Sequence, residues 1–194
     1  MAKKRKKHTT AYRKAYKKIA EEGLRQCYLI YGAAGIVLYR HWNRKKTAIY
    51  RLFDLSRQIW NECAQDNNRS MIQMCEKETG IEIQNGDGKS WKELPYLNSE
   101  IDTGMYTSAQ LVYIRQQQVR WIAAQVTACI LIALHRKYRF GFDRCSRFYG
   151  QIMDAQAECN MDPQKVREMC LAETGINVSR IVTEENNGES SRED

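Results

Sequence analysis

Proline and histidine are scarce in this sequence. Its 194 residues include 2 prolines, at Pro95 and Pro163, and 3 histidines. Because proline interrupts helices, its scarcity leaves long segments free to be helical. No Asp or Glu stands near the histidines in the pattern of a catalytic triad or a metal site. We therefore predict a mainly α-helical protein with no catalytic residues, no metal and no cofactor.

Long apolar runs are also missing. The longest, Tyr28 to Tyr39 and Val126 to Leu134, are too short to span a bilayer. No apolar segment follows the charged start as it does in a secretory signal. The 7 cysteines are odd in number and lack disulfide-type spacing, which is typical of reduced thiols. We expect a cytoplasmic protein with no membrane partner.

Acidic residues are absent from the beginning of the chain. Glu21 is the first acid of the chain. Five further acids stand within residues 184–194, and the net charge of +8 already includes them. A cationic run attracts phosphates because each neutralised phosphate releases counterions. The alternative is a solvated terminus that only improves solubility. The candidate nucleic-acid contacts in this basic arm are Lys3, Lys4, Arg5, Lys6, Lys7, Arg13, Lys14 and Lys17.

A short block of sequence occurs twice. Residues 74–81 read MCEKETGI and residues 169–176 read MCLAETGI, with six of eight positions identical. A match of this length indicates internal duplication. The same offset of ninety-five residues aligns Arg44 with Arg139. We therefore predict two diverged three-helix units within one chain.

The predicted organisation has five segments. They are a disordered basic arm (1–10), a first helical unit (11–83), a connector resembling a β-hairpin (84–106), a second helical unit (107–183) and a disordered acidic tail (184–194). In the first unit, the apolar spacing predicts a short helix ending near Gly23 and a separate buried helix from Arg25 to Trp42. Residues 81–83 and 176–178 alternate as short strands do, which makes them candidates for pairing.

The repeated block has structural candidates in both copies, namely Gly80 and Gly175, and Glu78 and Glu173. Each glycine is suited to end a helix in the left-handed conformation. Each glutamate then falls in the last helical turn, where the helix dipole disfavours a carboxylate by roughly a few tenths of a kcal/mol. A partner elsewhere should compensate, and Arg44 and Arg139 are the simplest candidates. Catalysis by these acids is the weaker alternative.

Two helix–turn–helix corners combine cations with aromatic rings. The first contains Arg40, His41, Trp42, Arg44, Lys45, Lys46 and Arg51, and the second contains His135, Arg136, Lys137, Tyr138, Arg139, Arg144 and Arg147. Cations and rings at the start of a helix suit a phosphate backbone. The alternative is that these are ordinary exposed corners of a basic protein. Base-specific readout is disfavoured, because the second helices lack an exposed row of Asn, Gln and Arg.

Two stretches resemble known proteins. Residues 31–42 (YGAAGIVLYRHW) and 134–142 (LHRKYRFGF) resemble segments of small, largely uncharacterised helical proteins of bacterial phages and integrative mobile elements. The resemblance covers much of residues 25–180. It implies a mobile-element accessory protein in the cytoplasm of a bacterial host cell. Proteins of that setting include transcription and replication factors, and anti-CRISPR inhibitors that occupy the nucleic-acid surfaces of Cas effectors.

Together these observations favour a non-enzymatic protein that binds nucleic acid or a nucleic-acid-handling complex, most concretely an anti-CRISPR inhibitor of a Cas nuclease. One alternative is a phage DNA-binding transcriptional regulator or replication accessory protein. Another is a protein-interaction or assembly factor whose basic arm is incidental.

Overall fold

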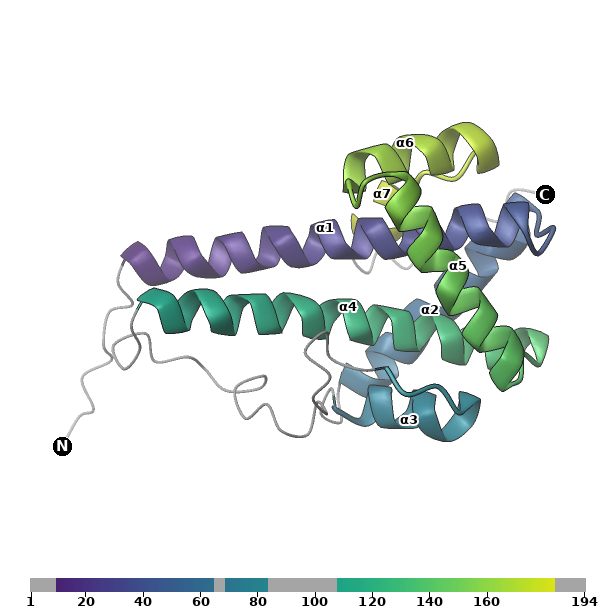
Figure 1. The fold of residues 1–194 in the computed structure, drawn as a ribbon, viewed down its shortest axis with the longest axis horizontal. Helices are drawn as coiled ribbons and strands as arrows, with labels where there is room; N and C mark the ends of the chain where they lie inside the picture. The colour runs from purple at the N-terminus through teal and green to yellow at the C-terminus, as the bar shows by residue number, and fades with distance from the viewer. Residues whose placement is uncertain (1–9, 65–68, 84–107, 184–194) are drawn as a thin grey trace.

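The computed structural model describes residues 10–64, 69–83 and 108–183 (Figure 1). These residues form α1 (Thr10–Arg40), α2 (Lys46–Ala64), α3 (Arg69–Thr79), α4 (Ser108–Tyr138), α5 (Phe142–Glu158), α6 (Pro163–Thr174) and α7 (Val178–Thr183). The prediction of a mainly α-helical protein is therefore confirmed. The arm before residue 10, the connector and the acidic tail lie outside the described residues.

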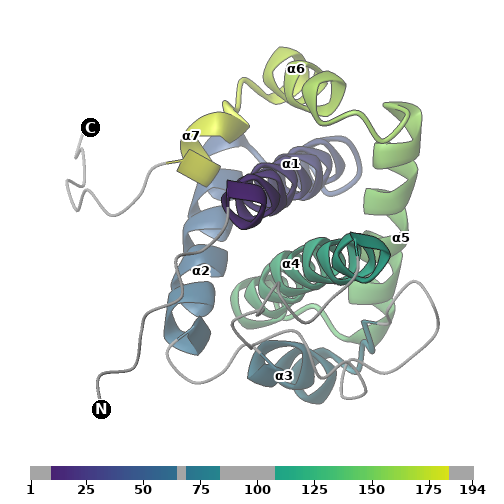
Figure 2. The same cartoon turned by 90° about the vertical axis from the view of Figure 1, so that its left-hand side faces the viewer.

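The two long helices, α1 and α4, run side by side in the same direction (Figures 1 and 2). The helices α2 and α3 pack mainly against α4, whereas α5, α6 and α7 pack mainly against α1. Each long helix is therefore covered by short helices from the other half of the chain.

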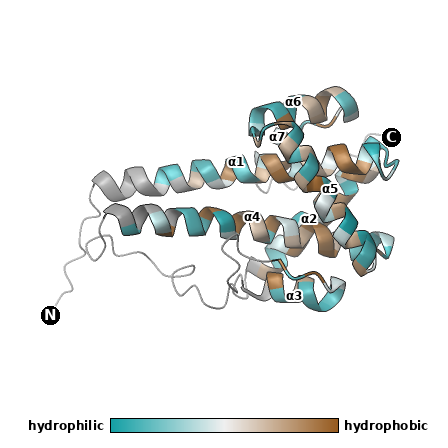
Figure 3. Cartoon of the chain, in the orientation of Figure 1, coloured by the Kyte–Doolittle hydropathy of each residue, from teal (hydrophilic) through white to brown (hydrophobic). Residues whose placement is uncertain are grey.

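One hydrophobic core draws on both halves of the chain. It includes Ile36 of α1, Phe53 of α2, Ile130 of α4 and Phe148 of α5, all fully buried. Figure 3 shows that the apolar residues of α1 and α4 lie mostly in their C-terminal halves, where the short helices surround them. The two halves thus share a core instead of folding as separate lobes.

The boundary predicted near Gly23 is wrong, because α1 continues without interruption from Thr10 to Arg40. Gly23 lies where α4 approaches closely, and a Cβ at this position would stand 2.8 Å from Cδ1 of Ile122. The glycine therefore serves the packing of two helices and does not end one.

The short strands predicted at residues 81–83 and 176–178 are not formed, and the described residues contain no strand. The alternating pattern still matches the burial. Ile81, Ile83, Ile176 and Val178 point into the core, and the polar residues between them are exposed. Burial against helices satisfies the same alternation as a sheet would, so the pattern could not distinguish the two.

One segment of α4, Gln116–Tyr138, is long and apolar enough to cross a membrane by length and composition. The uninterrupted apolar run within it, Val126 to Leu134, is shorter, which is why the sequence predicted no such segment. In its most apolar window, 67% of the residues are buried inside the protein. The core helix of a water-exposed protein has the same properties, so the segment is weak evidence for a membrane.

We expect Gly32→Ala to destabilise the protein. A Cβ on Gly32 would stand 2.5 Å from Cγ1 of Val166, a buried and stiff β-branched side chain. Overpacking of this kind costs about 1–3 kcal/mol, more than the gain in helix propensity, which is at most about 1 kcal/mol. Urea unfolding of the variant and the parent protein measures the difference.

Gly150→Ala is the matched control, because a Cβ on Gly150 in α5 meets nothing within 4 Å. This variant should be more stable than the parent by about 0.5–1 kcal/mol. Equal effects of the two substitutions would contradict the close approach of α1 and α6.

Candidate nucleic-acid interface

The turn between α1 and α2 and the turn between α4 and α5 lie together at one end of the molecule. Asn43 in the first turn and Arg139 in the second adopt the left-handed conformation, with φ angles of 48° and 55°. The rings of Trp42 and Phe140 are in contact, with centroids 4.5 Å apart. These turns therefore form one continuous surface, which we call the basic end and define as residues 41–46 and 137–144.

Aromatic and polar contacts hold the two turns together. The guanidinium of Arg44 lies 4.1 Å from the centroid of the Tyr138 ring, in a cation–π arrangement. The Tyr138 hydroxyl donates to the carbonyl of Ala48 over 3.3 Å, and Nε1 of Trp42 donates to Oε1 of Gln151 over 2.9 Å. Because side chains from both halves take part, the relative position of the turns is determined by packing.

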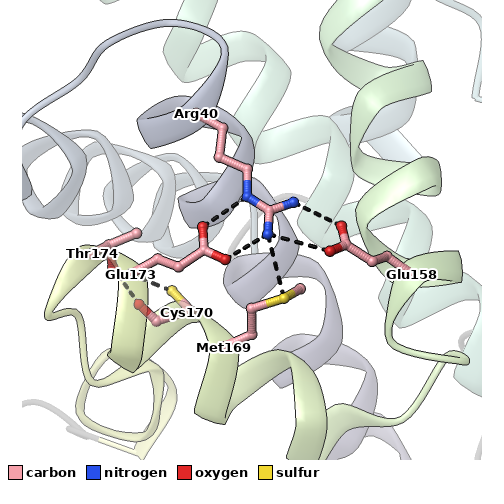
Figure 4. A network of polar contacts seen from close by, with 6 residues as sticks. All are labelled: Arg40, Glu158, Met169, Cys170, Glu173 and Thr174. Carbon is pink, nitrogen blue, oxygen red and sulfur yellow. Dashed lines mark hydrogen bonds and ion pairs between the residues drawn. The ribbon is translucent and has the colours of Figure 1, made fainter.

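Arg40, at the end of α1, is held by two acids (Figure 4). Its Nε donates to Glu173 over 2.7 Å, and its Nη1 donates to Glu158 over 2.7 Å. These hydrogen bonds, the one to Glu173 first, raise the pKa of Arg40, and the hydrogen bond from Arg40 lowers the pKa of Glu158. Arg40 thus joins the last turn of α6 and the end of α5 to α1.

Arg136, near the end of α4, makes the corresponding contact in the other half. Its Nε and Nη2 donate to the two carboxylate oxygens of Glu78 over 3.0 and 2.7 Å. The sulfur of Met74 lies 3.6 Å from Nη2, much as the sulfur of Met169 lies 3.5 Å from Nη2 of Arg40. Hydrogen bonding to Glu78 raises the pKa of Arg136.

The structure corrects the arginines that the sequence assigned to these glutamates. Glu78 and Glu173 are both paired, but with Arg136 and Arg40, while Arg44 stacks on Tyr138. The offset of ninety-five residues holds in α3 and α6, whereas Arg40 and Arg136 are ninety-six residues apart. Equivalent positions in the first two helices of each half are therefore shifted by one, and Arg44 does not correspond to Arg139.

The same shift explains other repeated features. The left-handed residues Asn43 and Arg139 are ninety-six residues apart, and so are the buried residues Ile49 and Cys145. The matching features of the first two helices of each half thus lie ninety-six residues apart, whereas those of the third helices lie ninety-five apart.

A threonine in the repeated block has a structural role that the sequence did not reveal. Thr79 donates to the carbonyl of Cys75 over 2.7 Å and accepts from the backbone N–H of Ile81 over 3.1 Å. Thr174 makes the same two hydrogen bonds, to Cys170 and from Ile176. Each threonine therefore closes its helix together with the left-handed Gly80 (φ 76°) or Gly175 (φ 68°). The sequence could have indicated this role, because threonine occupies the same position in both occurrences of the repeated block.

Six of the seven cysteines are buried, and Cys27 is partly buried. Burial raises the pKa of Cys75 to about 12 and that of Cys170 to about 11. No group of three or more His, Cys, Asp and Glu suited to a metal is found among the described residues. The buried thiols therefore act as small apolar side chains.

Several predicted binding residues are occupied by contacts within the protein. Arg40 and Arg136 are in ion pairs, and the Nδ1 of His135 lies 2.7 Å from the carbonyl oxygen of Phe140. Trp42 and Arg44 hold the turns together as described above. These residues form the frame of the basic end. Arg40 and Arg136 use their donors within the protein, whereas Nε of Arg44 is buried without a hydrogen-bond partner.

Five exposed cations and the exposed His41 remain on the basic end, and none of them has an ion pair with an acid among the described residues. The five cations are Lys45, Lys46, Lys137, Arg139 and Arg144. The first turn of α2 contains no acid, whereas α5 has Asp143 in its first turn. Backbone N–H groups at a helix start add to the attraction for anions. The α1–α2 turn is thus the more positive of the two.

Most of the basic arm lies outside this description. Lys3, Lys4, Arg5, Lys6 and Lys7 precede the described residues, and the side chains of Arg13 and Lys14 are likewise outside it. Lys17 is exposed on α1, with its Nζ 3.8 Å from Glu21. The structure does not bring Lys17 near the basic end, because both belong to one continuous helix and its following turn.

No protein-family model, curated protein or solved structure matches this chain. The fold and the basic end therefore define it only as an α-helical protein with a cationic end surface.

We expect a double-mutant cycle on Arg136 and Glu78 to give a coupling of about 0.5–1 kcal/mol, the upper range for partly exposed pairs, because the contact is bidentate. A cycle on Arg44 and Glu78 should give a coupling near zero. Urea unfolding of the single and double alanine variants measures both. A larger coupling for Arg44 would restore the pairing that the sequence suggested.

The Arg40 network also predicts a pH dependence. The pKa of Glu158 is lower in the folded protein than in a free glutamate. Its contribution to stability is therefore complete above the ordinary glutamate pKa and is lost as pH falls through the lowered value. In Glu158→Gln, the unfolding free energy should fall less than in the parent between about pH 6 and about pH 3.

Glu76→Gln is the control for this measurement, because Glu76 is exposed on α3 and has no ion pair with any described residue. It should leave the pH profile of the parent unchanged. If Glu158→Gln also left it unchanged, Arg40 would be held by Glu173 alone.

Proposed function

We propose that this protein binds the phosphate backbone of nucleic acid through the basic end and acts without catalysis. The observation that carries the proposal is the meeting of two cationic turns on one surface. Arg40 and Arg136, next to this surface, are paired with acids and hold the frame, while Lys45, Lys46, Lys137, Arg139 and Arg144 stay exposed. Because the backbone of both turns is already held in place, binding would order only the cationic side chains.

The α1–α2 turn supports phosphate binding in a second way. Lys45 and Lys46 stand at the start of α2, where the helix dipole disfavours cations by about 0.3–1 kcal/mol. A bound phosphate would be attracted by the same dipole and by both lysines. The helix dipole thus disfavours the two lysines in the free protein, whereas a bound phosphate would offset this repulsion in a complex.

The most specific form of the proposal is an anti-CRISPR inhibitor, carried by a phage or another mobile element and acting in the bacterial cytoplasm on a Cas nuclease. The sequence resemblance supports that setting. A phage transcriptional regulator or replication accessory protein that binds DNA directly is the alternative, and the exposed cations favour this simpler mode. An assembly factor would not need them.

We also propose that the chain arose by internal duplication. The paired contacts Arg40–Glu173 and Arg136–Glu78 support it, as do the matching Thr79 and Thr174 helix ends. In such a duplicate, each long helix binds the short helices of the other copy. Because the short helices of each copy pack on the long helix of the other, the two copies share one core.

Charge reversal of single lysines tests the binding surface. We expect Lys45→Glu, Lys46→Glu and Lys137→Glu each to weaken binding to duplex DNA by about tenfold at low salt. Each variant should also show a weaker salt dependence of the affinity, because a protein with one phosphate contact fewer releases fewer counterions on binding. Fluorescence anisotropy with a labelled duplex measures the affinity at several salt concentrations.

Lys165→Glu is the matched control, since it makes the same charge change at an exposed position on α6. It should weaken binding less than about twofold. Equal losses in all four variants would show that only net charge matters and would remove the basic end from the site. If the parent binds no DNA but retains a protein from nuclease-treated lysate, the inhibitor form replaces direct binding.

A further inference from the structure

The outer face of α5 is exposed at the surface of the described part of the chain. The helix packs on α1 and α4 through one face, whose buried residues are Cys145, Phe148, Ile152, Ala155 and Gln156. Figure 2 shows α5 at one edge of the molecule, with α1 and α4 between α5 and α2. The residues on the opposite face of α5 are exposed, and they include Ser146, Arg147, Gly150, Asp154 and Ala157.

Large apolar side chains gather along this helix. Seven large hydrophobic residues are exposed in the described part of the chain, and three of them lie in α5 or in the turn after it. These three are Phe142, Met153 and Met161, which are 56%, 44% and 48% exposed. The half-buried Tyr149 lies one helical turn before Met153, on the same side of α5. Burial of this apolar surface against a partner would be favourable.

The charges on the outer face of α5 are complementary to each other. Arg147 and Asp154 are seven residues apart, so they lie two helical turns apart on the same side of the helix. Both are exposed, and neither has an ion pair with another described residue. If a second copy of α5 ran antiparallel beside the first, each Arg147 would lie next to the Asp154 of the other copy.

The remaining residues of this face fit the same arrangement. In two antiparallel helices related by a two-fold axis, residues that face each other are equally far from the axis. Three pairs have their midpoints between positions 150 and 152, namely Arg147 with Asp154, Tyr149 with Met153, and Ser146 with Ala157. The charged pair lies along one border of the face, the apolar pair along the other, and the small residues lie between them.

Small residues along the centre of this face allow two helices to approach each other closely. Ser146 and Ala157 have short side chains, and Gly150 lies next to the expected axis. A Cβ on Gly150 would meet nothing within 4 Å, so the space above it is open to a partner. The same axis has Phe142 and Met161 on either side at nearly equal distances along the chain.

We infer that this protein forms a two-fold symmetric dimer in which α5 packs antiparallel against α5 of a second copy. Each favourable contact then occurs twice, as it does in every isologous interface. This inference goes beyond the proposed binding of nucleic acid and does not depend on it. The 17 residues of α5 span about 25 Å, which makes a small interface. The dissociation constant is therefore expected to be on the order of 10–100 μM.

Charge reversal within the pair tests the dimer. Analytical ultracentrifugation of the full-length protein between about 1 and 300 μM should show the parent changing from monomer to dimer. Arg147→Asp and Asp154→Arg should each weaken the association by at least about tenfold, because each substitution brings like charges together twice. Both positions are exposed, so circular dichroism should show that each variant keeps its helices.

An equimolar mixture of these two variants distinguishes the α5 pairing from a general effect of charge. One variant has acids at both positions and the other has arginines at both, so a mixed dimer regains both ion pairs. The mixture should associate within about threefold of the parent. Lys165→Asp is the matched control, because it makes the same charge change as Arg147→Asp at an exposed position on α6. It should change the dissociation constant less than about twofold.

Three results would overturn the inference. A parent that stays monomeric up to about 300 μM excludes the dimer at the expected strength. A dimer that persists unchanged in either single variant does not use this face of α5. A mixture that associates no better than its two components excludes the antiparallel pairing of Arg147 with Asp154.

Discussion

The apposition of α1 and α4 is the constraint on which the other described helices depend. The helices α2 and α3 bury their apolar faces on α4, and α5, α6 and α7 bury theirs on α1. Neither half of the chain can therefore complete a core with its own helices. Close packing at α1 requires residues without side chains, because a Cβ on Gly32 or Gly35 would stand within 2.9 Å of an atom of α6.

The two arginine contacts act at the periphery of this core. Arg40 and Arg136 extend from the ends of the long helices to acids in the last turns of α6 and α3. Each contact offsets a carboxylate that the helix dipole disfavours, and each holds a short helix against the long helix of the other half. Because these pairs are partly exposed, their value lies more in orientation than in stability.

The cations in and next to the two turns have two different roles. Arginines paired with acids or stacked on rings keep the turns in place, while the lysines beside them remain exposed. The acid at the start of α5, Asp143, makes the second turn less positive than the first. The two turns thus differ in surface charge, although matching arginine–glutamate contacts are present in both halves.

Part of the structure could be predicted from the sequence because the causes are local. The helical content follows from the scarcity of proline and the apolar spacing, and the helix ends at Gly80 and Gly175 follow from glycine in the left-handed conformation. The need for partners of Glu78 and Glu173 also followed from the helix dipole. The identity of those partners did not, because a shift of one residue outside the repeated block exchanged Arg40 for Arg44.

The sequence by itself determined the helices, the apolar positions and the places where charge needed compensation, since these depend on neighbouring residues. Only the tertiary structure decided that the halves interleave, that α1 passes through Gly23 without a break and that the two turns meet as one basic end. Those features depend on contacts between residues roughly a hundred positions apart in the chain, such as Trp42 with Phe140. No local pattern encodes such contacts, because many distant pairings satisfy the same apolar spacing.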